Sequence, residues 1–152
     1  MITDFAKQMI ETWRLGFIAT ADADGNVNLS PKGTFVVLDE KTFGFAEMRS
    51  PNTLANIATR PLVEVNFFDI LARKAARLRG MATTIDRGTE KFEKLLPQFA
   101  PLWPDLANRF NAIVTIEAQT CQPITSPAYD AGAKEEDLRQ IWCGKIAELC
   151  QC

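Results

Sequence analysis

The stretch from Leu29 to Asn56 constrains the fold of this chain more than any other, because two short apolar segments lead directly into a helix. The segments are Val36–Leu38 and Phe43–Phe45, and the polar residues 39–41 between them are typical of a tight turn. This pattern predicts a β-hairpin. The rest of the chain is therefore interpreted around a strand–turn–strand–helix unit.

A helix is expected to start immediately after this hairpin. Ser50 stands where an N-cap residue is needed, and Pro51 suits the first helical position because its missing N–H would have no partner there. Leu54 and Ile57 follow at helical spacing, and Pro61 predicts that the helix ends at about the preceding residue.

The start of this helix is a candidate anion site. Unpaired backbone N–H groups and the positive end of the helix dipole face the point where the strand ends. Arg49, Ser50, Asn52 and Thr53 surround that point with side-chain donors. The same residues also fit an ordinary helix cap beside a solvated arginine, so the wider pattern of the chain has to decide between the two interpretations.

Turn signals and alternating apolar residues predict further elements on both sides of this unit. Asp24–Gly25 is a strong turn signal between two strands, and Pro31, which cannot donate to a ladder, places the end of the second strand at a sheet edge or bulge. Further strands are expected at 16–21, 62–69, 75–85 and 110–120, and helices at 86–96, 135–149 and after the N-cap Thr3.

The order of these elements predicts a mostly β fold. About seven strands in short hairpins, with one helix between the fourth and the fifth, favour a small six- to seven-stranded antiparallel β-barrel with peripheral helices. A doubly wound sheet would alternate strands with helices throughout. The 152 residues suit one domain, and no repeat or linker divides the sequence, so a single domain over residues 1–152 is expected.

Two arginines stand out on the strand at 75–85. Arg77 and Arg79 share one face, opposite the apolar face, and lie about 7 Å apart by strand geometry. They could reach an anion, contact a partner subunit, or simply cover a solvated barrel exterior.

The composition excludes several classes of partner. The net charge of −2 offers no general attraction to nucleic acid or to an anionic membrane. No apolar run approaches the roughly 20 residues needed to span a bilayer, and the first 13 residues lack the apolar core of a secretory signal. A cytoplasmic location is the expectation that follows.

The chain has no histidine, which excludes a Ser-His-Asp triad, a Cys-His pair and any His-ligated metal. Cys143, Cys150 and Cys152 have a spacing that matches no common zinc pattern, so we expect no metal there and reduced thiols instead. What these thiols do is not indicated by the sequence. If the protein is an enzyme, a cofactor is expected to carry the chemistry.

A family resemblance connects these observations. The order of elements, with SPKGTFVVLDEKTFGFAE at 30–47, RSPNTLANIATRPLVEVNFF at 49–68 and RLRGMA at 77–82, resembles the FMN-binding split-barrel proteins related to pyridoxamine 5′-phosphate oxidase. The similarity extends from about Trp13 to about Cys121. The resemblance implies a split β-barrel of the FMN-binding type.

The resemblance also implies which residues hold FMN. In this family two strands run along the flavin, the end of the next strand lies beside its chain, and the following helix start holds the phosphate. We expect the carboxylate of Glu47 to point away from that phosphate, toward Lys32 or a ribityl hydroxyl. The implied cofactor-binding residues are Ser30, Pro31, Lys32, Gly33, Thr34, Phe35, Val36, Ala46, Glu47, Arg49, Ser50, Asn52 and Thr53.

The resemblance implies a homodimer with the flavin between subunits, and an oxidoreductase that acts on a small-molecule substrate or electron donor. No catalytic side chain is indicated. True pyridoxamine phosphate oxidases use a histidine-containing C-terminal segment, and this chain ends without one. Two alternatives remain: a protein that stores or binds flavin, deazaflavin or haem without turnover, and a dimeric protein that has lost its cofactor.

Overall fold

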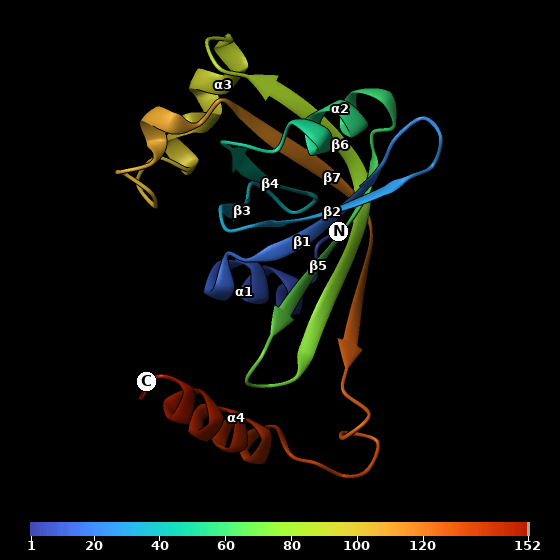
Figure 1. Ribbon diagram of the computed structural model, residues 1–152, viewed down its shortest axis with the longest axis vertical. Coiled ribbons are helices and arrows are strands. Elements are labelled where there is room, and N and C mark those ends of the chain that lie inside the picture. The colour runs from blue at the N-terminus through green and yellow to red at the C-terminus, as the bar shows by residue number, and fades with distance from the viewer. Residues whose placement is uncertain (152) are drawn as a thin grey trace.

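Seven antiparallel strands form one curled sheet in the computed structural model, which describes residues 1–151 (Figure 1). Their spatial order is β2-β1-β5-β6-β7-β4-β3, so β2 and β3 are the two edges. The predicted antiparallel split barrel is confirmed, and Pro31 lies on an edge strand as expected. The strands are β1 (Gly16–Ala21), β2 (Val27–Lys32), β3 (Phe35–Val37), β4 (Thr42–Glu47), β5 (Leu62–Asp69), β6 (Lys74–Asp86) and β7 (Ala112–Thr125).

The helices lie around the sheet (Figure 1). The Thr3 hydroxyl caps the first of them by accepting a hydrogen bond from the backbone N–H of Ala6 at 3.3 Å, as predicted. Within residues 1–151 no helix combines the length and the apolar composition required to cross a bilayer. The helices are α1 (Asp4–Trp13), α2 (Pro51–Thr59), α3 (Glu90–Leu95) and α4 (Glu135–Leu149), with short 3₁₀ turns η1 (Leu96–Gln98) and η2 (Ala107–Arg109).

Two predicted boundaries are wrong. The helix expected from Asp86 starts only at Glu90, because β6 continues to Asp86 and Gly88 then turns the chain with a φ of +86°. The final strand continues past Thr120 to Thr125, because the extra residues pair with the beginning of β6, where Lys74 lies opposite Thr125.

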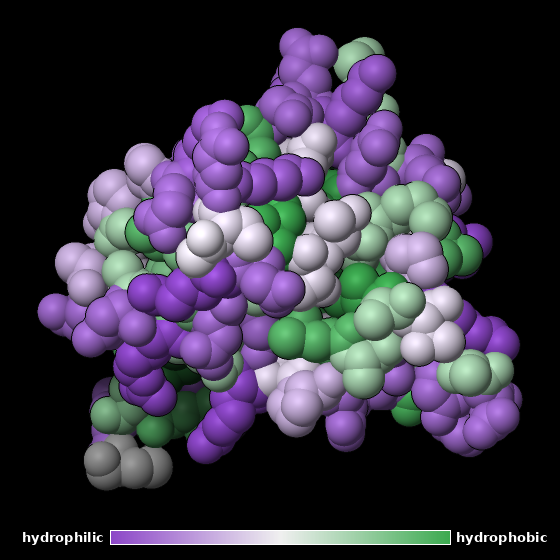
Figure 2. Space-filling view, turned by 90° about the horizontal axis from the view of Figure 1, so that it is seen from above, coloured by the Kyte–Doolittle hydropathy of each residue, from purple (hydrophilic) through white to green (hydrophobic). Residues whose placement is uncertain are grey.

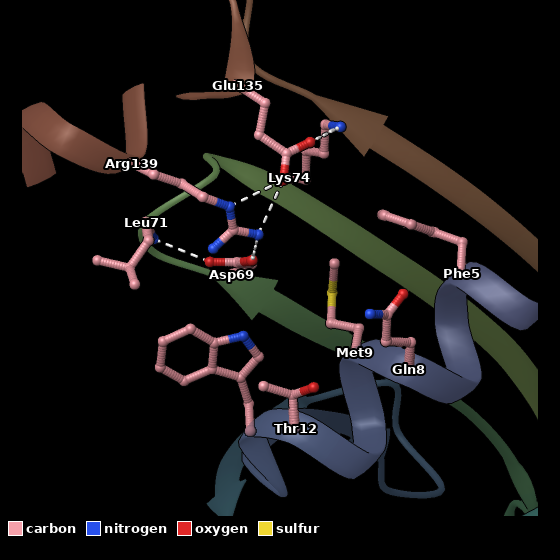
Figure 3. Close-up of a pocket in the computed structure, with 10 residues that line it drawn as sticks. Phe5, Gln8, Met9, Thr12, Asp69, Leu71, Lys74, Glu135 and Arg139 are labelled. Atoms are coloured by element: carbon pink, nitrogen blue, oxygen red, sulfur yellow. Dashed lines mark hydrogen bonds and ion pairs between the residues drawn. The ribbon is translucent and has the colours of Figure 1, made fainter. Parts of the chain in front are cut away.

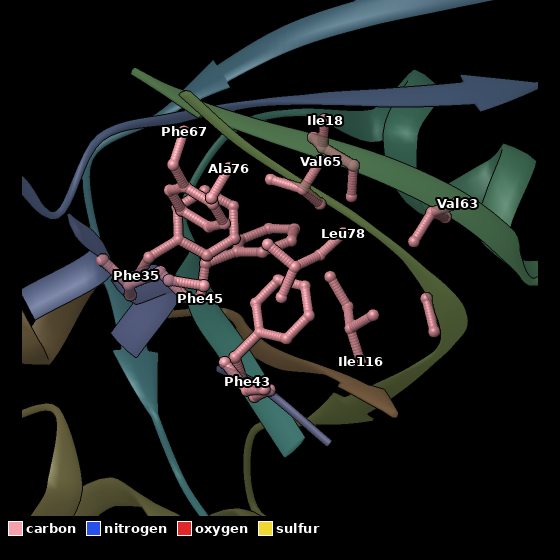
Figure 4. Packing of buried hydrophobic residues seen from close by; sticks show 14 of the residues in the cluster. Ile18, Phe35, Phe43, Phe45, Val63, Val65, Phe67, Ala76, Leu78 and Ile116 are labelled. Atoms are coloured by element: carbon pink, nitrogen blue, oxygen red, sulfur yellow. The ribbon is translucent and has the colours of Figure 1, made fainter. Parts of the chain in front are cut away.

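Phenylalanine rings fill the inside of the curled sheet (Figure 4). Phe35 is fully buried and meets Phe67 edge-on at 4.8 Å between ring centroids, and Phe45 at 5.3 Å. Such edge-to-face pairs add about 0.5–1.5 kcal/mol each beyond the area they bury. Gly16 is required beside them, since a Cβ there would come within 2.7 Å of the Phe67 ring.

A second, smaller core supports the segment between α3 and β7. Phe92, Phe99 and Phe110 are fully buried in it, and they pack with Val36 and other apolar residues at the ends of β3, β4 and β6. Trp103 packs against this cluster and remains partly exposed. The segment is therefore fixed to the barrel beside the ends of β4 and β6.

Candidate ligand-binding groove

An open groove of about 430 Å³ lies where three parts of the chain meet. One side comes from the end of β2 and its connection to β3, another from the end of β4, and the third from the segment that precedes β7. The groove is lined by Pro31, Lys32, Gly33, Thr34, Ala46, Glu47, Met48, Arg49, Trp103, Leu106 and Arg109.

A buried charged cluster underlies the groove. The ammonium of Lys32 lies 3.1 Å from Oε2 of Glu47, and these side chains are only 10% and 2% exposed. Lys32 also donates to the hydroxyl of Ser50, which in turn donates to the same Oε2, both at 2.5 Å. The predicted approach of Glu47 to Lys32 is therefore present.

The second oxygen of Glu47, Oε1, is buried and has no hydrogen-bond partner within residues 1–151. The backbone around it is fixed, because Asn111 donates its N–H to the Glu47 carbonyl at 2.8 Å and its side-chain amide to the Met48 carbonyl at 2.7 Å. Nearly all buried polar groups in proteins are hydrogen-bonded. An unpartnered carboxylate oxygen beside an open groove therefore suggests a donor that enters the groove.

Positive charge accumulates at the same place. Arg49 and Arg109 line the groove, both are exposed, and neither forms an ion pair within the described part of the chain. Glu47 neutralises Lys32, so the two arginines leave the groove with a net charge of about +2. A cationic groove in a chain with a net charge of −2 favours an anionic ligand.

The helix start next to the groove differs in detail from the sequence prediction. Ser50 occupies the N-cap position of α2, but its hydroxyl makes no capping hydrogen bond and instead bridges Lys32 and Glu47. The first turn of α2 therefore keeps donors that no side chain caps. Asn52 is exposed, whereas Thr53 is buried and accepts a hydrogen bond from Asn28 at 3.2 Å.

The structure therefore divides the predicted cofactor residues into groups. Pro31, Lys32, Gly33, Thr34, Ala46, Glu47 and Arg49 line the groove together, and Ser50 supports it through Lys32. Phe35 and Val36 lie in the two apolar cores, so their side chains support the groove from beneath. Ser30 pairs with Ile18 inside the sheet, and the side chain of Thr53 fastens α2 to β2.

Sequence reasoning missed one side of the groove. Trp103, Leu106 and Arg109 reach it from the segment before β7, for which the sequence indicated no binding residue. Arg87 holds this segment by donating to the carbonyls of Phe110 at 2.6 Å and Ala107 at 2.7 Å. Only the fold brings these residues beside β2 and β4, so no local signal identifies them.

A second cleft of similar volume, also about 430 Å³, lies between α1, the β5–β6 turn and α4 (Figure 3). Arg139 donates to Asp69 at 2.7 Å and to Glu135 at 2.9 Å, and Lys74 pairs with Glu135. Hydrogen bonds from Lys74 and Arg139 hold the pKa of Glu135 below its ordinary value. These charges neutralise one another, so the cleft lacks the free cations found in the groove.

Comparisons with known proteins identify a family and several structures of the same fold. The family model described as pyridoxamine 5′-phosphate oxidase matches residues 2–118, which include every residue that lines the groove. A comparison with curated protein sequences gives no match.

Several solved structures have the same fold. HupZ of Group A Streptococcus is 26% identical with a TM-score of 0.68, covering 83% of this chain and 96% of that chain. HutZ, a haem-storage protein from Vibrio cholerae, is 15% identical with a TM-score of 0.66, covering 82% of this chain and 95% of that chain. An FMN-binding protein from Syntrophomonas wolfei is 13% identical with a TM-score of 0.66, covering 80% of this chain and 84% of that chain. Because the family model spans most of the sequence, this chain belongs to the pyridoxamine 5′-phosphate oxidase family.

Proposed function

We propose that this protein binds FMN in the groove and acts as a flavin-dependent oxidoreductase on a small molecule. The observation that carries the proposal is the cationic groove at the end of β4 and the start of α2, within the region that matches the family. When bound, FMN supplies the electron-accepting ring, and the protein supplies binding and orientation.

The residues present fit a flavin phosphate. Arg49 and the uncapped first turn of α2 offer charge and N–H donors to the phosphate. The backbone of residues 31–34 and the Trp103 side chain offer flat and apolar surface for a ring, and Glu47 Oε1 offers an acceptor. Gly33 leaves room, because a Cβ placed there would have no atom within 4 Å.

The gap at Gly33 gives a first test of where FMN lies. The variant Gly33→Val places a branched side chain in open space without a clash in the chain, and its backbone does not need a positive φ. We expect unchanged thermal stability and FMN binding weakened at least tenfold. Equal FMN affinity in parent and variant, measured by fluorescence titration, would exclude this part of the groove.

The decisive experiment compares FMN with riboflavin, which lacks the phosphate. Charge-assisted hydrogen bonds contribute about 1.5–3 kcal/mol, so Arg49→Ala should weaken FMN binding roughly 10- to 150-fold. Riboflavin binding should not change. Arg60→Ala at the other end of α2 is the matched control, because it removes the same charge from an exposed residue far from the helix start. An equal loss for both ligands would contradict the phosphate assignment.

A homodimer completes the proposed function, with the flavin between the subunits. On the outer face of the sheet, exposed large apolar side chains occur on β1, β5 and β6 and continue onto β2. Apolar residues also reach the surface among hydrophilic ones in the view from above (Figure 2). Exposed apolar patches of this kind mark interaction sites. The outer-face residues are Phe17, Val27, Leu29, Leu62, Phe68 and Met81, each at least 38% exposed.

The arginine pair of β6 lies on the same face. Arg77 and Arg79 share the carboxylate of Glu64, at 3.6 and 2.9 Å, which leaves one positive charge unbalanced. Light scattering of the purified protein should give about 34 kDa, twice the chain mass of 16.9 kDa. A mass of one chain at micromolar concentration would remove the dimer proposal.

A second candidate function is storage or binding of haem, flavin or deazaflavin without turnover. It is supported by the fold shared with the haem-storage protein HutZ and with a protein described as an F420 reductase, 20% identical with a TM-score of 0.54. The chain has no histidine, so a haem iron would need another residue as its axial ligand. The visible absorption spectrum of the purified protein separates the possibilities, because flavin, deazaflavin and haem absorb at different wavelengths.

A further inference from the structure

We propose that Glu47 Oε1 is the hydrogen-bond acceptor that selects the ligand of the groove, by requiring an N–H or O–H donor at that point. This inference rests on the proposed flavin site and assigns a role that family membership alone does not give. It starts from a buried carboxylate that lines the groove and has one oxygen without a partner.

The two oxygens of Glu47 have different surroundings. Oε2 accepts a hydrogen bond from Ser50 and forms an ion pair with Lys32, whose ammonium also lies 5.6 Å from the centre of the Phe45 ring. These contacts fix the Oε2 side of the carboxylate. Oε1 is therefore presented in one fixed direction, as a preorganised acceptor.

Other unpartnered buried atoms do not have this setting. Asn66 Oδ1 and Thr84 Oγ1 also lack partners within residues 1–151, but they belong to β5 and β6, and neither residue lines the groove. Both are neutral groups, for which the lack of a partner is less unfavourable than for a carboxylate. Glu47 thus combines burial and charge in a residue that lines the groove.

The chemistry of the groove defines the class of ligand. Arg49 and Arg109 require an anionic group, while Glu47 repels a second carboxylate or phosphate oxygen and attracts a neutral donor. A phosphate that carries hydroxyl or imide donors satisfies both demands. FMN has two such sources, the hydroxyls of its ribityl chain and the N3–H of its ring.

The substitution Glu47→Gln tests the acceptor. Because Ser50 donates to Oε2 and Lys32 forms an ion pair with it, the amide oxygen of glutamine should take that place and turn its NH₂ toward the groove. An acceptor thus becomes a donor of almost the same shape. FMN should bind the variant roughly 10- to 150-fold more weakly, which corresponds to about 1.5–3 kcal/mol. The control Glu93→Gln removes the same charge from an exposed residue of α3.

Two FMN analogues identify the donor. N3-methyl-FMN lacks the ring donor, and a flavin with a phosphopentyl chain lacks the hydroxyls. One of them should bind the parent protein roughly 10- to 150-fold more weakly than FMN does, and Glu47→Gln should abolish that difference. In Glu47→Gln the buried charge of Lys32 loses its partner. If this unfolds the single variant, the double variant Lys32→Met with Glu47→Gln, which removes both charges, is used for the titration instead.

A direct readout is the ¹³C signal of the Glu47 carboxylate, assigned by its loss in Glu47→Gln. It should shift on saturation with FMN and not with the analogue that lacks the donor. Failure of FMN to bind the parent overturns the flavin proposal and this inference together. Binding of FMN and both analogues with equal affinity, whichever residue stands at position 47, overturns this inference and leaves the flavin proposal standing.

Discussion

Different forces stabilise the barrel and hold the C-terminal helix α4 against it. Inside the sheet, Phe35, Phe43, Phe45 and Phe67 are fully buried and contact one another in a continuous apolar cluster. Helix α4 has no buried residue among those described, and in Figure 1 it lies apart from the strands.

What holds α4 is charge. Arg139 pairs with Asp69, Lys74 pairs with Glu135, and the guanidinium of Arg73 lies 4.4 Å from the centre of the Trp142 ring. These ion pairs are partly exposed, and ion pairs at protein surfaces contribute about 0–1 kcal/mol each, whereas a buried phenylalanine contributes several. We therefore expect the barrel to set the stability of the chain and α4 to open locally at much lower cost.

Substitution of a core phenylalanine should have the largest effect. Phe67→Ala leaves a cavity beside the rings of Phe35 and Phe43 and should lower the free energy of unfolding by about 3–5 kcal/mol. The matched change on α4, Ile141→Ala, removes a side chain that is 63% exposed. It should change the free energy of unfolding by about 0.5 kcal/mol or less. Denaturant titration at one protein concentration measures both. Similar losses for the two variants would show that α4 is part of the core.

Loss of Arg139 should affect α4 alone. Arg139→Ala removes the contacts with Asp69 and Glu135, so amide exchange within α4 should accelerate about fivefold, equivalent to roughly 1 kcal/mol. Exchange in the barrel should stay unchanged, and added salt should reproduce the effect in the parent. Lys145→Ala is the control, since among residues 1–151 Lys145 pairs only with Glu148 of the same helix. Faster exchange in β5 or β6 would contradict this separation.

The smallest expected effect is a dependence on pH. Hydrogen bonds from Lys74 and Arg139 lower the pKa of Glu135. The contribution of Glu135 to the attachment of α4 is therefore complete above its unfolded-state pKa and is lost as pH falls through its folded-state pKa. The hydrogen bond to Glu135 raises the pKa of Lys74, whose contribution is lost as pH rises through its folded-state pKa. Attachment of α4 should thus be constant between about pH 5 and pH 9 and weaken outside that range.

Fluorescence of Trp142, recorded against pH in a variant without the other tryptophans, follows this attachment because the ring lies under Arg73. Glu135→Gln should flatten the acidic part of the curve. An unchanged acidic part in that variant would assign the effect to another carboxylate.

Most of the fold could be predicted because strong local signals mark its boundaries. Pro51 and Pro61 bracket α2, and the Asp24–Gly25 turn separates β1 from β2. The errors occur where tertiary pairing overrides the local pattern. The residues after Thr120 include a proline and do not alternate, yet they form part of β7 because β6 lies alongside to pair with them.

The candidate site was less accessible to sequence reasoning. Residues 31–34, Ala46 and Glu47 were implied by the family resemblance, and Arg49 followed from the strand–helix unit. The hydroxyl of Ser50 has a different role from the cap that its position suggests. Trp103 and Arg109 reach the groove through the second apolar core, which only the folded chain assembles. Of the three cysteines near the C-terminus, Cys143 and Cys150 are exposed on or next to α4, and Cys152 lies outside the described residues.

The strand order has a consequence for the kinetics of folding. Strand β4 pairs with β7, and β1 pairs with β5, so two of the central ladders join segments that are distant in sequence. Chains dominated by such non-local pairing fold in milliseconds to seconds, slower than helical bundles of similar size. The β3–β4 hairpin emerges from the ribosome long before β7 exists, and until then the rings of Phe43 and Phe45 cannot complete their core. A nascent chain paused before β7 should therefore be the form of this protein most prone to aggregation and most dependent on chaperones.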